Sequence, residues 1–333
     1  MSKNILALDL GYGSIKVAYR TALGQLRYQK LITAIGEVHK TENFDIKDVN
    51  IYEYESQLYY IGPNALRLPS KDIIDIVDYN KFKLVSPIII SYYLNLIQAG
   101  ENITFDTIVV GLSLVYANNS ADYLEYLKNK LNLKVIVLPQ GISSKFAIER
   151  YGLDPTDDSQ ITNVKFNDYI GVDIGFNTID VFSVIGGKSS ISATKGYKGD
   201  GVIKVAKELS NDVEHNLRIE LSIQDYKNVL ETGFLYHRGN NFDLSAKIQE
   251  YFVEYLIKLI DTVERDYSKA INKVDRLIMV GGGANLIQKY INDDKLQTHV
   301  DKKYSGDFLR IPKIPEFYNV LGYFTKVEND FQS

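Results

Sequence analysis

Two segments of the chain carry the same arrangement of an aspartate, a glycine turn and a β-branched run. Residues 5–19 are ILALDLGYGSIKVAY and residues 169–183 are YIGVDIGFNTIDVFS, with four identities when Asp9 is aligned with Asp173. An aspartate at a strand end can hold hydrated Mg²⁺, and turn glycines let main-chain N–H groups approach a phosphate. The repetition favours a phosphate–metal site over two ordinary hairpins.

The first segment adds a positive charge to this chemistry. Gly11 and Gly13 flank the turn, and Lys16 follows on the next strand, where its ammonium group can pair with a phosphate. The segment is not a dinucleotide-binding fingerprint, because Lys16 occupies the place of the third glycine and a strand follows instead of a helix. It is not a Walker A loop either. Taken alone, it would be an ordinary hairpin with an exposed lysine.

Two further segments have residue types that suit nucleotide chemistry. Gln140, in the sequence Pro-Gln-Gly before an expected helix, can orient a water molecule without being a strong base, as phosphoryl hydrolysis requires. Residues 281–284 read GGGA directly after an apolar strand. Such a turn lets a flat base or a ribose lie on the main chain. The alternative for Gln140 is an ordinary turn glutamine, and the alternative for residues 281–284 is a flexible loop.

The periodicity of apolar residues predicts an α/β chain that positions these motifs. The expected strands are 5–8, 14–19, 26–34, 51–54, 58–61, 103–115, 134–138, 169–172, 178–184 and 276–280. The expected helices are 81–98, 120–131, 143–151, 201–209 and 244–267. Asp200 is expected to cap the fourth of these. The fifth has one apolar face, formed by Ile248, Phe252, Leu256, Leu259, Ile260 and Val263.

The spacing of the repeat predicts two domains. Positions 9 and 173 differ by 164 residues, almost half of the 333-residue chain, which indicates an internal duplication. The polar stretch 154–160 is the best candidate boundary. We therefore expect one domain over 1–155 plus about 320–333, with a small subdomain at about 30–80, and a second domain over 156–319.

Composition excludes several classes of protein. The chain has no cysteine, which rules out disulfides and Cys-containing zinc sites, and its four histidines are far apart. A net charge of −4 argues against a protein that coats nucleic acid. The longest apolar stretch, 84–97, is interrupted by polar residues, so we expect a cytoplasmic protein with no membrane partner. The 25 tyrosines reflect either coding bias or surface aromatics available for self-contact.

The order of the motifs resembles that of a known superfamily. The hairpin at Asp9, the Pro-Gln-Gly segment, the hairpin at Asp173 and the glycine turn at 281 resemble the phosphate 1, connect 1, phosphate 2 and adenosine motifs of the actin/Hsp70/sugar-kinase superfamily, and 316–324 resembles connect 2. The resemblance runs from about residue 4 to 325.

Within that superfamily the chain most resembles the bacterial actin-like proteins of the ParM/StbA plasmid-segregation family. The supporting residues are Lys16, the T-x-D ending at Thr178 and Asp180, and the segments 111–116 and 199–202. The departures are Phe176 in place of a glycine, Tyr12 in place of a small residue, Ser113 in place of a proline, and Gln140 where ParM-type sequences have glutamate. Because of these departures, the resemblance implies nucleotide binding but does not imply a particular hydrolysis rate or nucleotide preference.

The resemblance implies an α/β fold with two related actin-like (RNase H-like) domains, mixed sheets flanked by helices and a nucleotide cleft between them. It implies Mg²⁺ with ATP, or GTP, as the cofactors. Asp9 and Asp173 would hold the metal through water, and with Gln140, which positions the attacking water, they form the implied catalytic set. The implied nucleotide-binding residues are Gly11, Tyr12, Gly13, Ser14, Lys16, Gly175, Phe176, Asn177, Thr178, Gly201, Gly281, Gly282, Gly283 and Ala284.

The resemblance implies an ATPase that forms filaments and segregates plasmid or phage DNA. Its partners would be further copies of itself and a small adaptor bound to centromere-like DNA, with no sequence-specific DNA binding of its own. The alternative is a small-molecule kinase of the same superfamily, against which Gln140 argues, since a kinase needs a catalytic carboxylate there. An Hsp70-like chaperone would need a peptide-binding domain after about residue 325.

Overall fold

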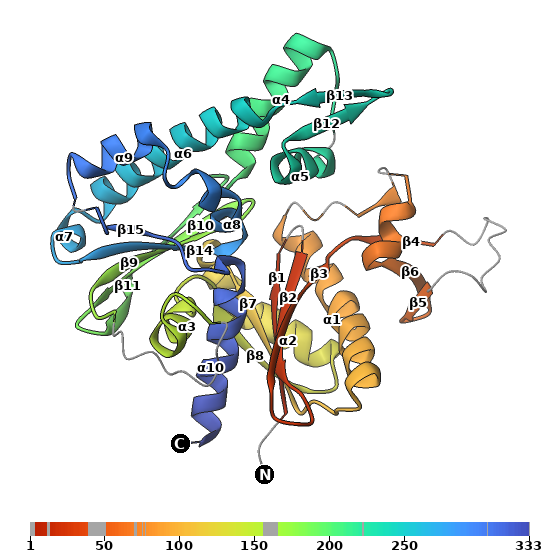
Figure 1. The fold of residues 1–333 in the computed structure, drawn as a ribbon. Helices are drawn as coiled ribbons and strands as arrows, with labels where there is room; N and C mark the ends of the chain where they lie inside the picture. The colour runs from red at the N-terminus through yellow and green to blue at the C-terminus, as the bar shows by residue number, and fades with distance from the viewer. Residues whose placement is uncertain are drawn as a thin grey trace. The chain divides into compact units, whose positions relative to one another are not determined.

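The computed structural model describes residues 4–11, 14–38, 51–69, 72–74, 76, 78–155, 166–221, 223–304 and 306–332. Contacts between Cα atoms divide the chain into two compact units. Unit 1 comprises residues 1–112, 116–139 and 319–333, and unit 2 comprises 113–115 and 140–318. Each unit is built around a five-stranded mixed sheet (Figure 1).

The sheet of unit 1 has the strand order β3-β2-β1-β7-β8. Its strands are β1 (Ile5–Leu10), β2 (Ser14–Arg20), β3 (Leu26–Ile32), β7 (Thr107–Leu112) and β8 (Lys134–Pro139). Helices α1 (Tyr79–Glu101) and α2 (Ser120–Lys130) share a hydrophobic core with this sheet. All six residues of β1 are buried, as expected for the central strand of a covered sheet.

The last helix, α10 (Tyr318–Gln332), belongs to unit 1 from residue 319 onward, whereas its first residue, Tyr318, belongs to unit 2. Gly111 in β7 leaves room for Tyr323 of α10, because a Cβ atom at position 111 would overlap the ring of that tyrosine. An ion pair joins Arg20 of β2 to Glu328 of α10, with Nε to Oε1 at 2.6 Å. The C-terminal helix is therefore anchored to the strands at the start of the chain.

A small sheet completes unit 1. Strands β4 (Ile35–Glu37), β6 (Gln57–Ile61) and β5 (Ile51–Tyr54) pair antiparallel in the order β4-β6-β5, followed by the 3-10 helix η2 (Gly62–Arg67). This sheet falls within the range expected for a small subdomain.

Unit 2 repeats the sheet of unit 1. The order is β11-β10-β9-β14-β15, with β9 (Tyr169–Ile174), β10 (Thr178–Ile185), β11 (Lys188–Lys198), β14 (Arg276–Val280) and β15 (Leu309–Arg310). Its helices are α3 (Ser144–Tyr151), α4 (Ile203–Leu217), α5 (Ile223–Thr232), α6 (Ser245–Asp266), α7 (Ser268–Ile271), α8 (Gly281–Ile287) and α9 (Asp294–Asp301). A separate hairpin, β12 (Phe234–His237) with β13 (Asn240–Asp243), leads into α6.

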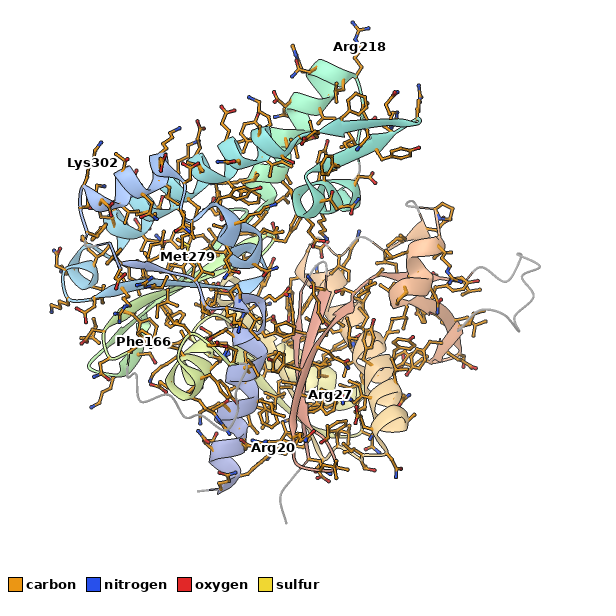
Figure 2. The ribbon with its side chains drawn as sticks, viewed as in Figure 1. Arg20, Arg27, Phe166, Arg218, Met279 and Lys302 are labelled. Atoms are coloured by element: carbon orange, nitrogen blue, oxygen red, sulfur yellow. The ribbon has the colours of Figure 1, made fainter. Side chains whose placement is uncertain are left out.

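The core of unit 2 lies between its sheet and helices α4, α6, α8 and α9. The expected apolar face of α6 is buried, with Phe252, Leu256 and Val263 fully inside. Figure 2 shows Met279 of β14 within this core, whereas Arg218 after α4 and Lys302 after α9 point outward. The 3.6-residue apolar period therefore predicted the core-facing side of the longest helix of this unit.

The duplication is visible in both position and topology. Strands β1 and β9 begin 164 residues apart, at Ile5 and Tyr169, and β2 and β10 begin the same distance apart, at Ser14 and Thr178. In each unit the first strand pairs antiparallel with the second and parallel with a later one. The two predicted hairpins and the mixed α/β class are confirmed.

Three expectations need correction. The strand expected over 103–115 is only Thr107–Leu112, because the chain then turns into a 3-10 helix at Leu114–Asn119. The helix expected at 201 begins at Ile203, since the two preceding residues close onto the turn after β9. Asp200 does not cap it; its carboxylate pairs with Lys204 instead.

The segment 140–155 belongs to unit 2, whereas the sequence placed it in the first domain. The reason is a set of contacts that hold it there. The carbonyl of Gly152 accepts a hydrogen bond from the hydroxyl of Tyr318 (3.0 Å), and that of Leu153 accepts one from the main-chain N–H of Lys313 (2.9 Å). Most of the polar stretch 154–160 lies outside the described residues.

Among the helices of the described residues, none is long and apolar enough to cross a lipid bilayer.

Candidate functional site

The first hairpin joins a buried aspartate to a buried lysine. Asp9 lies near the end of β1 with 4% of its surface exposed, directly opposite Lys16 of β2. Burial raises the pKa of the Asp9 carboxyl, while the charge of Lys16 and the hydroxyl of Tyr323 act in the opposite direction. Unit 1 therefore holds a carboxylate and an ammonium group side by side at its hairpin.

The turn of this hairpin is closed by its own main chain. The N–H of Gly11 donates to the carbonyl of Ser14 (3.1 Å), and the hydroxyl of Thr33 donates to the carbonyl of Gly11 (3.0 Å). A Cβ atom on Gly11 would lie 2.8 Å from the Ser14 oxygen, so a glycine is required there. Tyr12 and Gly13, two of the expected nucleotide-binding residues, lie outside the described residues.

The second hairpin carries two carboxylates where the first carries an ion pair. Asp173 of β9 lies directly opposite Asp180 of β10, and only 3% and 1% of their surfaces are exposed. The hydroxyl of Ser113 donates to Oδ1 of Asp180 (3.1 Å). Asp180 stands 164 residues after Lys16, so the duplication has exchanged an ammonium group for a carboxylate. This concentrates negative charge in unit 2, as a cation site requires.

The Pro-Gln-Gly segment crosses over this acidic pair. Gly141 has φ +74°, and a Cβ atom there would lie 2.8 Å from the Cβ of Asp180 and 3.5 Å from that of Asp173. Gln140, which is half-buried, directly precedes this glycine. The expected water-positioning residue therefore stands one position before a close contact with an expected metal ligand, Asp173, within unit 2.

The turn after β9 is tied to the start of α4. The carbonyls of Gly175, Phe176 and Asn177 accept hydrogen bonds from the main-chain N–H groups of Val202 (3.1 Å), Ile203 (2.8 Å) and Gly199 (2.8 Å), in that order. A Cβ atom on Gly201 would lie 2.6 Å from the Gly175 oxygen. Gly201 is therefore a glycine because the turn approaches it closely. Thr178 is buried at the start of β10.

Phe176, at the position where the family has a glycine, has a structural role. Its ring packs against the core of unit 2, and the ammonium nitrogen of Lys227 in α5 lies 4.7 Å from the ring centroid. Such a cation–π contact is favourable. The departure from the motif therefore links the turn to α5.

The glycine run after β14 forms the first turn of α8. Gly281 has φ +92°, and a Cβ atom there would overlap Oδ1 of Asp173. Gly283 is equally constrained, since its Cβ would lie 2.7 Å from the carbonyl oxygen of Ile174. Gly281, Gly283 and Ala284 are buried, whereas Gly282 is half-exposed. The run is a fixed helix start packed on Asp173 and Ile174 at the end of β9, which excludes the flexible-loop alternative.

The expected residues thus form one group in each unit. Unit 1 contributes Asp9, Gly11, Ser14 and Lys16; unit 2 contributes Gln140, Asp173, Gly175, Phe176, Asn177, Thr178, Gly201, Gly281, Gly282, Gly283 and Ala284. Within the described residues, no cluster of three or more His, Cys, Asp or Glu side chains is arranged to chelate a metal. A Mg²⁺ ion that keeps several waters needs fewer protein ligands than that.

Sequence reasoning left Asp180 out of the site. The signal for it was available, because its T-x-D position aligns with Lys16 in the repeat. The pairing across the ladder makes it a neighbour of Asp173, and only the register of β9 with β10 shows this.

Comparison with known proteins gives a family match and a fold match. Residues 171–293 match the family described as archaeal actin homologue MreB-like, C-terminal. None of the curated proteins compared with the chain matches it by sequence.

Solved structures resemble the whole chain. A 15-stranded ParM filament from Clostridium botulinum has 18% identity over 99% of this chain and 100% of its own, with a TM-score of 0.70. Ta0583, an archaeal actin homolog, has 16% identity over 98% of this chain and 99% of its own, with a TM-score of 0.69. Bacillus thuringiensis ParM with ADP has 15% identity, full coverage of both chains and a TM-score of 0.62. The chain therefore has an actin-like fold.

Proposed function

We propose that this chain is an ATPase that assembles into filaments in the presence of Mg-ATP. The observation that carries the proposal is the duplicated hairpin, in which each unit ends its central strand pair in a buried aspartate beside a glycine turn. The ParM filament from Clostridium botulinum and the ADP-bound ParM from Bacillus thuringiensis support polymer formation and nucleotide binding for an actin-like chain of this length.

The glycine positions test whether a nucleotide suits these residues. At Gly201, Gly281 and Gly283 a side chain would collide with the second hairpin, so the main chain approaches the acidic pair closely. Close main-chain approach and buried carboxylates are what a phosphate–metal unit needs. We infer that the residues present fit Mg²⁺ with ATP or GTP.

Each residue then has a role that its position supports. Asp9 and Asp173 would hold Mg²⁺ through water, and Lys16, Ser14, Thr178 and the hairpin main chain would bind phosphate. Gln140, next to the glycine that packs on the acidic pair, would orient the attacking water. The α8 residues 281–284 bind the nucleoside. The bound Mg²⁺ supplies charge neutralisation on the phosphates.

The biological role that we propose is segregation or positioning of plasmid or phage DNA in the cytoplasm. It rests on the resemblance to ParM-type proteins, in which filaments act through an adaptor. A small DNA-binding adaptor would therefore recognise centromere-like DNA, and this chain would contact other copies of itself. Its net charge of −4 agrees with a protein that leaves DNA binding to a partner.

Phosphate accounting tests the reaction. Purified protein is incubated with Mg-ATP, and inorganic phosphate, ADP and pelletable protein are measured together. We expect one inorganic phosphate per ADP, with protein in the pellet. In a parallel incubation that also contains small hydroxyl compounds as phosphoryl acceptors, ADP formed without inorganic phosphate, together with a phosphorylated acceptor and no pellet, would instead identify a kinase of the same superfamily.

A further inference from the structure

Unit 2 exposes two aromatic side chains on the hairpin that precedes α6. Phe234 and Tyr236 of β12 are 44% and 73% exposed and lie on the same side of the strand, whereas Leu235 between them is buried in the core. The hairpin projects at the end of unit 2 where α4 and α5 meet (Figure 1). We call Phe234 and Tyr236 the aromatic pair.

The tip of this hairpin fixes the aromatic pair in place. Arg238 and Gly239, the two turn residues, have φ values of +49° and +82°. Positive φ at both residues is the mark of a type I′ turn, whose twist matches that of the strands. Arg238 is exposed at the tip. The hairpin therefore exposes two aromatic rings and a positive charge on a regular two-stranded ladder closed by a tight turn.

The same unit contains a small pocket of about 80 Å³, open to solvent, between α4, α6 and the strands β10 and β11. Its apolar lining includes Ile179, Val205, Leu259 and Val263. Its rim carries charged residues, Lys204, Glu208 and Lys258. The floor is thus apolar and the rim is mixed in charge, as in a site that takes an aromatic side chain.

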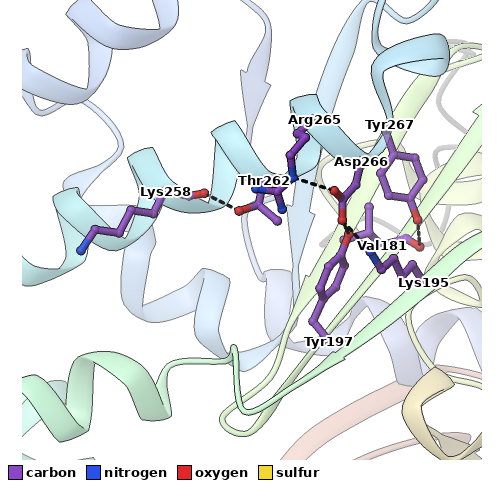
Figure 3. A network of polar contacts seen from close by, with 8 residues as sticks. All are labelled: Val181, Lys195, Tyr197, Lys258, Thr262, Arg265, Asp266 and Tyr267. Atoms are coloured by element: carbon purple, nitrogen blue, oxygen red, sulfur yellow. Dashed lines mark hydrogen bonds and ion pairs between the residues drawn. The ribbon is translucent and has the colours of Figure 1, made fainter.

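The hydroxyl groups around the pocket are already used. That of Tyr197 donates to Oδ2 of Asp266 (2.8 Å), and that of Thr262 donates to the carbonyl of Lys258 (2.8 Å), as Figure 3 shows. That of Tyr255 donates to the carbonyl of Asp200 (2.9 Å). These residues therefore offer an incoming ligand the rings of the two tyrosines and the methyl group of Thr262 instead of free hydroxyls, which favours an aromatic or apolar occupant over a phosphate or a sugar.

The aromatic pair cannot fill the pocket of its own chain. The hairpin leads directly into α6 at Ser245, and the pocket begins about ten residues further on, around Tyr255 to Val263. At 1.5 Å per residue, the 14 residues from Ser245 to Leu259 span about 21 Å. A contact between the two features must therefore join two copies of the chain.

We propose that the aromatic pair of one copy inserts into the α4–α6 pocket of a second copy. The contact joins two different surfaces of the same unit, so it is heterologous, and repetition without closure produces an open polymer. Charge complementarity supports this occupant: the hairpin brings Arg238 to a rim that carries Glu208. In this contact Asp243, which lies opposite Phe234 in the hairpin, would approach the rim lysines.

The position of the pocket gives the contact a second consequence. Ile179, part of its lining, follows Thr178 and precedes Asp180 in the second hairpin. An inserted ring therefore packs against the strand that carries those two residues. The contact deepens the proposed function, on which it rests, by placing a subunit interface against β10, the strand that carries Asp180.

Cross-linking tests the contact directly, because the chain has no cysteine of its own. A Tyr236→Cys protein is mixed with a Glu208→Cys protein under mild oxidation, with and without Mg-ATP, and pelleting is measured in the same samples. Leu23→Cys, at a position 86% exposed in unit 1, replaces Tyr236→Cys in the control mixture. We expect a disulfide-linked dimer from the first mixture at least tenfold more abundant than from the control.

The outcomes separate this contact from the proposed function. Pelleting in Mg-ATP without a cross-link above the control overturns the contact and leaves filament formation standing. A cross-link without pelleting supports the contact and overturns filament formation, and the absence of both overturns both. An apolar fluorescent probe that binds the monomer pocket and stays bound in pelleted protein would show a small-molecule site instead and would also overturn the contact.

A charge exchange provides the second measurement. Arg238→Glu and Glu208→Arg are each expected to raise the critical concentration for pelleting at least fivefold. The double variant, in which the charges are exchanged, is expected to return to within about twofold of the original protein. A double variant as defective as the two single ones would contradict the proposed pairing.

Discussion

Asp173 lies directly opposite Asp180 in the ladder that joins β9 to β10, and both side chains are buried. The corresponding pair in unit 1 is Asp9 with Lys16, in which the charges are opposite. The two halves of the chain have thus kept one topology and changed one charge. The acidic pair is costly for folding, because like charges directly opposite in an antiparallel pair are destabilising. The Mg²⁺ ion proposed above would offset this cost.

Asp180→Asn tests both the destabilisation caused by the acidic pair and its proposed role in binding a cation. Removing one charge is expected to stabilise the protein without Mg²⁺ by about 1 kcal/mol, as measured by urea unfolding. It is also expected to slow Mg-dependent ATP hydrolysis at least tenfold, because less negative charge remains to attract the cation. Asp301→Asn, at an exposed position, is the control for both measurements. Unchanged hydrolysis in Asp180→Asn would contradict a cation site at the pair.

Gly281→Ala is expected to displace Asp173. The substitution puts a Cβ atom against Oδ1 of Asp173 and at a φ of +92°, so the free energy of unfolding should fall by about 3 kcal/mol. Gly100→Ala is the matched control, since a Cβ atom there meets nothing within 4 Å and the residue lies in α1. Alanine in that helix should stabilise by about 0.5 kcal/mol. Equal effects on thermal unfolding would refute the close packing of α8 on β9.

The sequence predicted the hairpins and the face of α6 because both depend on local signals. Glycine after an aspartate-ended strand marks a turn, and the apolar period of α6 is regular over its whole length. The sequence did not predict β11, whose residues KSSISATKGYK include few β-branched or aromatic types. That strand forms because β10 offers it a partner.

The sequence named the candidate site residues one by one, but it did not predict how the structure arranges them. Three successive glycines at 281–283 have poor helix propensity, and α8 begins there because only glycine tolerates the approach of Asp173 and Ile174. The role of Asp180 likewise depends on strand register. Such contacts are tertiary, so propensity and spacing do not reveal them.

Gln140→Ala is expected to leave nucleotide binding intact and to slow hydrolysis. Gln140 is proposed to orient the attacking water, and loss of that group should reduce the hydrolysis rate about 100-fold, in the range of one positioned catalytic group. Assembly in Mg-ATP should persist, and the polymers should last longer. The measurements are phosphate release and the lifetime of the pelletable fraction, with Gln25→Ala, at an exposed position, as the control. Normal turnover in Gln140→Ala would remove this residue from the mechanism.

The stability of unit 2 should depend on pH through Asp266. A hydrogen bond from Lys195 lowers the pKa of the Asp266 carboxyl, with Tyr197 and Arg265 as further donors (Figure 3). Because the pKa of Asp266 is lower in the folded state than in the unfolded state, the ionised carboxylate stabilises the folded protein at pH values above the unfolded-state pKa of about 3.9. This stabilisation is lost as the pH falls through the folded-state pKa.

Asp266→Asn should therefore destabilise by about 1 kcal/mol at pH 7, and the difference should shrink below about pH 4. Urea unfolding of both proteins between pH 3 and 7 measures this. A difference that grows on acidification would have the wrong sign for the proposed network.

Light scattering at 90° during addition of nucleotide tests the central claim, that Mg-ATP drives assembly of this actin-like chain. We predict a rise in scattering with Mg-ATP above a critical concentration, filaments in negative-stain images of the same samples, and a decay as ATP is consumed. Asp173→Ala should abolish the rise. No rise and no filaments with Mg-ATP or Mg-GTP over a 100-fold range of protein concentration would contradict the account.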